Sequence, residues 1–221
     1  MTWAGSPSGN RDELTLELAA TAARLIAEDG CDYATAKRKA AQLVLGEGRG
    51  AKGVLPENGL VESELRRYLR TFGGDSHAAL LAELRAIALD LMEFLAPFNP
   101  HLVGAVLNGT ATGHSDLHLH LFTDSAKDVE IFLLNEGLRF TVDEAHEPAG
   151  ALESIHLQLP QRLLNGRKLA PGAVLSVLPT DAVRVASRFR SADPSLSATE
   201  KAGRAGLAAV RSLLAVPPTA R

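Results

Sequence analysis

Apolar residues repeat with a helical period through the first hundred residues of the chain. They fall three and four positions apart, which is the spacing that gives an amphipathic helix one apolar stripe. Asn10 and Asn58 are predicted to cap two of these helices, and a glycine or proline follows each stretch. The pattern predicts helices near residues 11–29, 33–45, 60–72 and 76–95.

After Pro97 the apolar period shortens to two, the period of a β-strand. Strands are predicted at residues 102–107, 116–122, 138–142, 153–159 and 173–178, and helices at residues 125–136 and 201–214. Ser197 and Glu200 have the spacing of a capping box before the last helix. We therefore predict an α+β fold, with a helical array at residues 1–97 and a mixed sheet with flanking helices at residues 98–221.

The strand predicted at residues 116–122 carries the clearest chemical pattern. Its leucines alternate with polar residues, so they fall on one face and are predicted to be buried. The opposite face carries Asp116, His118 and His120. These three side chains could bind a divalent metal together, with His114 or His156 as a further ligand, because two imidazoles in a His-x-His pair share one face. The alternative is a solvated sheet face whose rings are hydrogen-bonded and bind no metal.

Composition limits the possible functions. The net charge is −3, and the basic residues near Arg66 are interleaved with acidic ones, so nucleic-acid binding is not expected. Cys31 is the single cysteine, which excludes an intrachain disulfide and fits a reducing compartment. The first residues have no secretory-signal pattern, and no apolar run reaches the ~20 residues of a membrane span. We therefore expect a cytoplasmic protein with no membrane contact.

Residues 102–134 resemble the polymerase-β-like nucleotidyltransferase superfamily. Its pattern is a hydrophobic strand, a Gly-Ser pair, a short helical passage and an acid–apolar–acid strand, with a third acid later. Gly109 and Thr110 match the Gly-Ser pair, Asp116 matches the first acid, and His118 stands in the place of the second. Two further segments, residues 32–41 and residues 122–135, resemble a group of small bacterial proteins of this type.

The resemblance implies a site for a nucleoside triphosphate with Mg²⁺ or Mn²⁺. Gly109, Thr110 and Ser115 would contact the nucleotide, while Asp116 and His118 would be the catalytic residues. The metal ligands would be Asp116, His118 and His120. Imidazole is a poorer ligand for Mg²⁺ than a carboxylate is, so weak or lost transferase activity is expected. The alternative is a non-catalytic regulatory protein that uses the same scaffold to bind a protein partner.

Overall fold

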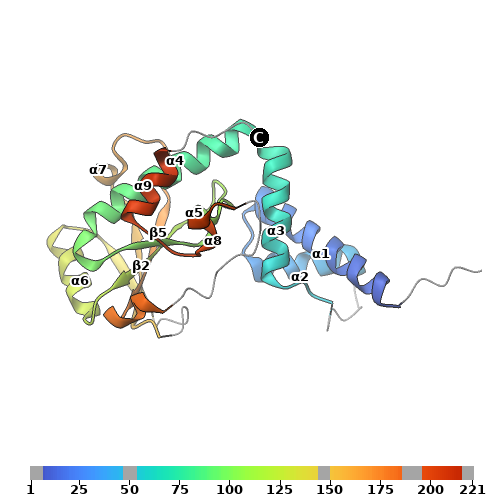
Figure 1. Cartoon of the computed structure of the whole chain (residues 1–221), viewed down its shortest axis with the longest axis horizontal. Coiled ribbons are helices and arrows are strands. Elements are labelled where there is room, and N and C mark those ends of the chain that lie inside the picture. The colour runs from blue at the N-terminus through green and yellow to red at the C-terminus, as the bar shows by residue number, and fades with distance from the viewer. Residues whose placement is uncertain (1–6, 47–53, 144–149, 186–195, 216–221) are drawn as a thin grey trace, which may run out of the picture. The chain divides into compact units, whose positions relative to one another are not determined.

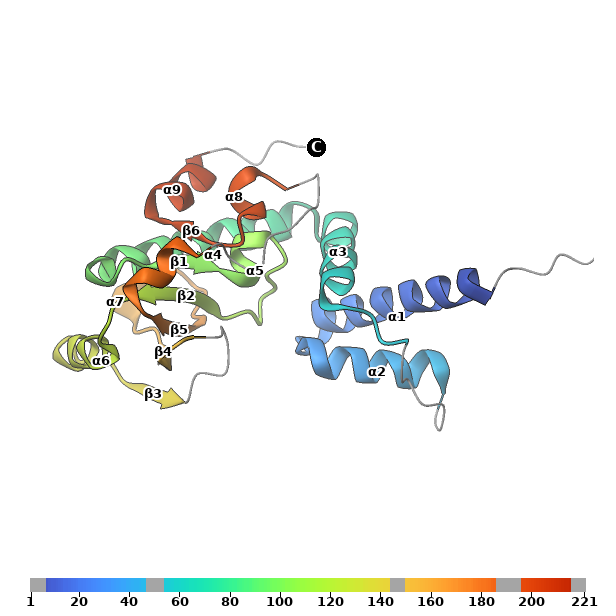
Figure 2. The same cartoon turned by 60° about the horizontal axis from the view of Figure 1, so that its bottom comes forward.

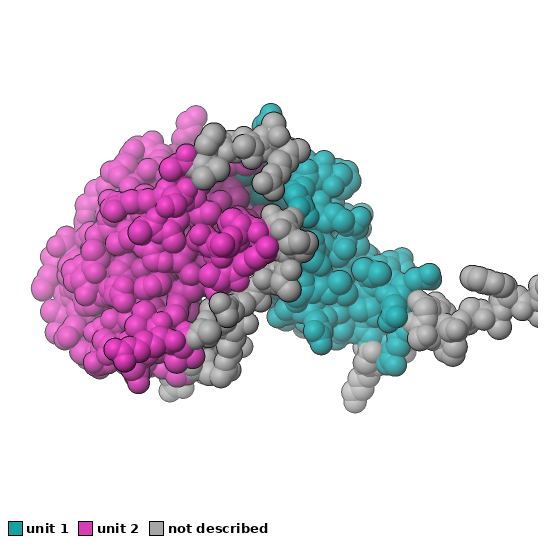
Figure 3. Space-filling model, in the orientation of Figure 1, with its two compact units in different colours: residues 1–77 teal, residues 78–221 magenta. Residues whose placement is uncertain are grey.

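The computed structural model describes residues 7–46, 54–143, 150–185 and 196–215, and the side chains from residue 11. The chain divides into two compact units, residues 1–77 and residues 78–221 (Figure 3). The sequence placed the boundary at Pro97, where helices give way to strands. The units divide earlier because the second part of helix α4 packs with the sheet. No helix in the described ranges is both long and apolar enough to cross a membrane.

The first unit is helical. Its elements are α1 (Pro7–Asp29), α2 (Tyr33–Leu45), α3 (Asn58–Tyr68), a π-helical turn η1 (Leu69–Gly73) and the start of α4 (Gly74–Phe94). Alanines allow the helices to approach closely, and larger apolar residues such as Leu18, Val61 and Leu65 complete the core. The Asp32 side chain caps α2 by accepting a hydrogen bond from the backbone N–H of Thr35.

The second unit is built around a six-stranded mixed sheet (Figures 1 and 2). The strands are β1 (His101–Val103), β2 (Leu117–Phe122), β3 (Phe140–Asp143), β4 (Glu153–Gln158), β5 (Gly172–Leu178) and β6 (Ala205–Gly206). Their order is β3-β4-β5-β2-β1-β6. β2 and β5 pair in parallel, and all other pairs are antiparallel.

Helices and short turns connect these strands. They are η2 (Ala96–Phe98), α5 (Gly104–Asn108), α6 (Ala126–Asn135), α7 (Gln161–Leu164), η3 (Thr180–Arg184), α8 (Ala198–Lys201) and α9 (Leu207–Ala215). The Ser125 side chain caps α6, and the predicted capping box of Ser197 and Glu200 is present before α8. These caps satisfy backbone N–H groups that a helix terminus leaves unpaired.

The two faces of the sheet differ in chemistry. On one face, the β2 leucines at 117, 119 and 121 are fully buried with Leu175 of β5, as the alternation predicted. α4, α6 and α9 contribute to the same core, through residues such as Leu91, Leu133 and Val210. On the other face, the register aligns His118 with Val174, and His120 with Ser176. The predicted fold class, α+β with helices before a mixed sheet, is therefore confirmed.

The strand predicted at residues 102–107 is wrong for most of its length. Only residues 101–103 of that region are extended, and residues 104–108 form α5. Gly104 has φ +70°, a conformation that glycine adopts easily and that turns the chain out of the sheet. The carbonyl of Ala105 then accepts hydrogen bonds from three successive N–H groups, those of residues 109, 110 and 111. β1 is therefore a three-residue strand, antiparallel to β2.

Other predicted boundaries also move. α1 begins at Pro7, before the predicted cap Asn10, because proline suits the first turn of a helix. The predicted helix at residues 201–214 is interrupted by β6, which adds to the edge of the sheet beside β1. The predicted loops at residues 46–53 and 143–150 lie almost wholly outside the described residues.

Candidate functional site

Three adjacent strands form a regular array of side chains on the polar face of the sheet. The central row crosses β2, β5 and β4 and consists of His118, Val174 and His156. The two flanking rows contain Asp116, Gly172 and Gln158 on one side and His120, Ser176 and Ser154 on the other. The array therefore contains one carboxylate, three imidazoles and two hydroxyls around Val174. The pairing of β4 with β5 places His156, considered from the sequence as a further ligand, in the same row as His118.

Asp116 is held at the start of β2 by its neighbour on β5. One carboxylate oxygen, Oδ1, accepts a hydrogen bond of 3.1 Å from the backbone N–H of Gly172. A Cβ atom at residue 172 would lie only 2.7 Å from this oxygen. The absence of a side chain at Gly172 thus allows the Asp116 carboxylate to lie across the start of β5.

His118 and His156 are both exposed, and each has a carboxylate nearby. The pKa of His118 is lowered by desolvation; Asp116 opposes this shift, and the neighbouring His156 adds to it. The Nε2 atom of His156 lies 3.4 Å from a carboxylate oxygen of Asp143 on β3. Two strand spacings separate the two histidines, so their Cα atoms are about 10 Å apart. Both rings are accessible to a ligand on this face, although they do not form a close pair.

His120 differs from His118 because it is buried, with 7% of its surface exposed. Burial and the positive charge of Arg204 lower its pKa to about 4, so the ring is neutral at pH 7. Its Nδ1 atom is buried without a hydrogen-bond partner in the described part of the chain. His120 therefore shares a face with the other predicted ligands but is not presented to solvent as they are.

Arg204 and Phe122 cover one side of His120. The Arg204 guanidinium lies 5.0 Å from the centre of the Phe122 ring and donates hydrogen bonds to carbonyls of Val183 and Val185 at the end of η3. Figure 2 shows η3, in orange, in front of the sheet. His101 meets the same ring edge-on, at 5.1 Å between ring centres. Sequence reasoning missed this group, because Arg204 comes about eighty positions after Phe122 in the chain and no local motif connects the two residues.

The predicted nucleotide-binding residues do not join the array. Thr110 is buried, and its hydroxyl donates a 2.7 Å hydrogen bond to the side-chain oxygen of Asn108. The Ser115 hydroxyl accepts a hydrogen bond from the backbone N–H of Thr112. A Cβ at Gly109 would lie 3.8 Å from side-chain atoms of Leu81 in α4 and Glu200 in α8. These polar groups therefore stabilise the loop itself in this structure.

A different glycine lies beside the histidine face. Gly104 follows β1 directly, and a Cβ built on it would lie 3.6 Å from the Cβ of His118. In the superfamily pattern, the Gly-Ser pair comes between the hydrophobic strand and the short helical passage. In the structure that position belongs to Gly104 and Ala105, because β1 precedes them and they begin α5. Gly104 and Ala105 thus lie between β1 and α5, whereas Gly109 and Thr110 follow α5.

The polar face does not fit a pair of magnesium ions. Mg²⁺ prefers oxygen ligands, and a two-metal site needs several carboxylates around ions about 4 Å apart. Asp116 is the only carboxylate of the array. Glu153, the nearest acid on β4, points to the opposite face, where it contacts Lys127 at 3.4 Å. No three His, Cys, Asp or Glu side chains in the described ranges lie close enough together to hold a metal.

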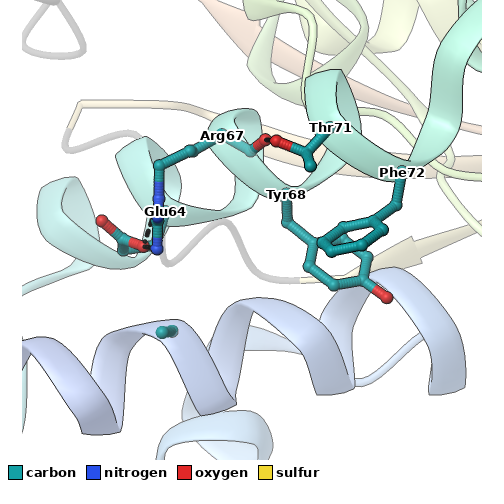
Figure 4. Close-up of a pocket in the computed structure, with 6 residues that line it drawn as sticks. Glu64, Arg67, Tyr68, Thr71 and Phe72 are labelled. Atoms are coloured by element: carbon teal, nitrogen blue, oxygen red, sulfur yellow. Dashed lines mark hydrogen bonds and ion pairs between the residues drawn. The ribbon is translucent and has the colours of Figure 1, made fainter.

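The helical unit has a separate surface hollow between α1 and α3. Figure 4 shows the rings of Tyr68 and Phe72 side by side above α1, and Arg67 turned toward Glu64. Phe72 is 71% exposed, and the Tyr68 hydroxyl donates to Glu28. The charged groups here pair with each other, so the hollow has no group free to bind an anion.

Comparison of the chain with protein-family models, curated proteins and solved structures finds no significant match. The resemblance to the nucleotidyltransferase superfamily therefore rests on the residues described above.

Proposed function

We propose that residues 78–221 form a nucleotidyltransferase-like module that binds a nucleotide weakly and has lost nucleotidyl transfer. The observation that carries this proposal is that Asp116 is the single carboxylate of the array on β2, β5 and β4, with Asp143 lying farther along the same face on β3. Across β2, β5 and β4, the positions around Asp116 are occupied by glycine, valine, serine, glutamine and histidine.

The missing carboxylates matter because the transfer reaction depends on electrostatics. The triphosphate and the attacking hydroxyl need cations to neutralise developing negative charge, and carboxylates hold those cations. Histidine at residue 118 supplies a neutral ring at pH 7, since desolvation lowers its pKa. A histidine-lined face therefore supports ligand binding better than it supports two-metal catalysis.

The remaining groups support a limited form of binding. The Asp116 carboxylate is close enough to His118 to oppose the lowering of that ring's pKa, and the backbone turn at Gly104 lies against the same histidine. One carboxylate and one imidazole suit Mn²⁺ better than Mg²⁺. Weak, manganese-dependent binding of a nucleoside triphosphate is the result that these residues favour.

The test combines a binding assay and a transfer assay on the full chain. We expect ATP or UTP with Mn²⁺ to raise the melting temperature more than with Mg²⁺, and Asp116→Ala to remove the increase. We expect no labelled nucleotide to be transferred to components of a cell lysate. Metal-dependent labelling that Asp116→Ala abolishes would overturn the loss of activity. If no nucleotide raises the melting temperature, the alternative of a non-catalytic, partner-binding protein replaces this proposal.

A further inference from the structure

The strand β3 forms one edge of the sheet and is accessible along its length. Thr141, Val142 and Asp143 are all exposed, while Phe140 is half-buried. The opposite edge is β6, which has only two residues and runs directly into α9. An exposed edge strand presents unpaired backbone groups that can pair with another strand. β3 is therefore the edge that offers the longer template.

Apolar side chains are exposed at the same end of the sheet. Val142 pairs with Ile155 and so points to the core face, yet it is 40% exposed. α6 lies on that face, and its outer side exposes Ile131 and Leu134, by 55% and 62%. α6 and β3 are joined by the four residues 136–139, and Figure 2 shows them at the same end of the unit. Among the described strands β3 pairs only with β4, so this edge combines free strand backbone on its outer side with exposed apolar surface.

The sequence of this edge is complementary to itself. A two-fold axis perpendicular to the sheet would place a second β3 antiparallel to the first and keep the core and polar faces aligned. With Thr141 opposite its own copy, Phe140 lies opposite Val142 of the second copy on the core face. On the polar face, Arg139 lies opposite Asp143 of the second copy, and the pair occurs twice.

The charged residues of this pairing are available. Arg139 is exposed and has no ion pair with the described residues, and the Asp143 side chain is 69% exposed. Asp143 contacts His156 at 3.4 Å through one oxygen, and most of its side chain remains exposed. Opposite charges facing each other across an antiparallel pair are favourable, and like charges are unfavourable.

We propose that the chain forms a two-fold dimer through antiparallel pairing of β3 with β3 of a second copy. Pairing makes one continuous twelve-stranded sheet, and the exposed apolar side chains of α6 and Val142 become buried beside those of the second copy. The two histidine faces then lie on the same side of the joined sheet. This inference is independent of nucleotide binding, because β3 contributes nothing to the residues that would hold the nucleotide.

The test is the molar mass of the full chain in solution, measured by light scattering after gel filtration at about 5 to 200 μM. We expect the mass of a dimer, with dissociation at the lowest concentrations. Val142→Lys puts a charge into the apolar contact and should give a monomer. Arg139→Asp should also give a monomer, because it places two carboxylates opposite each other. The double variant Arg139→Asp, Asp143→Arg reverses both charges and should restore the dimer.

Leu43→Lys is the matched control, since Leu43 is 64% exposed on α2 of the other unit and should leave the dimer intact. Circular dichroism establishes that each variant is folded. A monomeric wild-type chain at 200 μM would overturn the proposal. So would a dimer that survives both single substitutions, because it would use another surface. Failure of the charge reversal to restore the dimer would overturn the proposed register.

Discussion

Asp116 occupies space that exists only because Gly172 has no side chain. The carboxylate accepts a hydrogen bond from the Gly172 N–H, and a Cβ at residue 172 would lie 2.7 Å from the carboxylate oxygen. The position of the Asp116 carboxylate is thus coupled to the pairing of β2 with β5.

We expect Gly172→Ala to displace the Asp116 carboxylate and to lower the free energy of unfolding by about 1 kcal/mol, the worth of one hydrogen bond. In an Asp116→Ala background, Gly172→Ala should lower the free energy of unfolding by less, because the new methyl group has no carboxylate to displace. Urea denaturation of the wild type, both single variants and the double variant measures this coupling. Effects that add to within about 0.3 kcal/mol would show that the two residues are independent.

A second prediction compares the two faces of β2. Leu119 is fully buried in the core, so Leu119→Ala should reduce the free energy of unfolding by about 2–5 kcal/mol. His118 is exposed on the other face, and His118→Ala should change the free energy of unfolding by less than about 0.5 kcal/mol. Denaturant titrations of the two variants provide the comparison. Equal losses would contradict the assignment of the faces.

A third prediction concerns acid sensitivity. The pKa of His120 is about 4 in the folded chain, below the value of 6.5 expected for an unfolded histidine. Between these values the unfolded chain binds the proton more readily than the folded chain does. The contribution of the neutral His120 ring to the free energy of unfolding is therefore fully present above pH 6.5. It decreases as the pH falls toward 4, by about 3 kcal/mol in all.

The measurement is the free energy of unfolding at several pH values between 4 and 7, for the wild type and for His120→Gln. The variant cannot bind this proton, so its stability should fall less steeply over the same window. His77→Gln is the control, because it removes a histidine from the other unit. Parallel curves for the wild type and His120→Gln would contradict the prediction.

A fourth prediction is that carboxylates can be restored to the polar face. His118→Asp places a second acid two positions from Asp116, and Val174→Asp adds a third in the neighbouring strand. Each should strengthen Mg²⁺ binding, because carboxylate oxygens suit this ion better than imidazole or valine. Calorimetric titration of the wild type and both variants measures the affinity. An unchanged affinity in His118→Asp would mean that residues 116 and 118 cannot share a metal.

The sequence predicted much of the fold, because the relevant signals are local. Alternation in β2 assigned its two faces, and the spacing of Ser197 and Glu200 predicted the capping box. β1 was predicted too long because an apolar run does not reveal the left-handed turn at Gly104. The helix at residues 201–214 was predicted as continuous because β6 is stabilised by pairing with β1, which no local pattern records.

The candidate site was predictable only along a single strand. Asp116, His118 and His120 follow from alternation, but burial of His120 depends on Phe122, Arg204 and other groups brought together by folding. His156 was a candidate from the sequence, but its position in line with His118 depends on the register of β4 with β5. Such pairings connect residues far apart in the chain, and one sequence contains no local signal for them.

The order of strands in the sheet has a consequence for synthesis on the ribosome. β2 can pair with β1 once both have emerged, but its parallel partner β5 begins at Gly172, and β6 completes the other edge only at Gly206. At roughly 5–20 residues per second, one side of β2 remains unpaired for about 3–10 seconds. During that interval the leucine face of β2 lacks the apolar residues of β5 and α9 that later pack with it. The nascent chain should therefore be a target for chaperones between the emergence of β2 and that of β5.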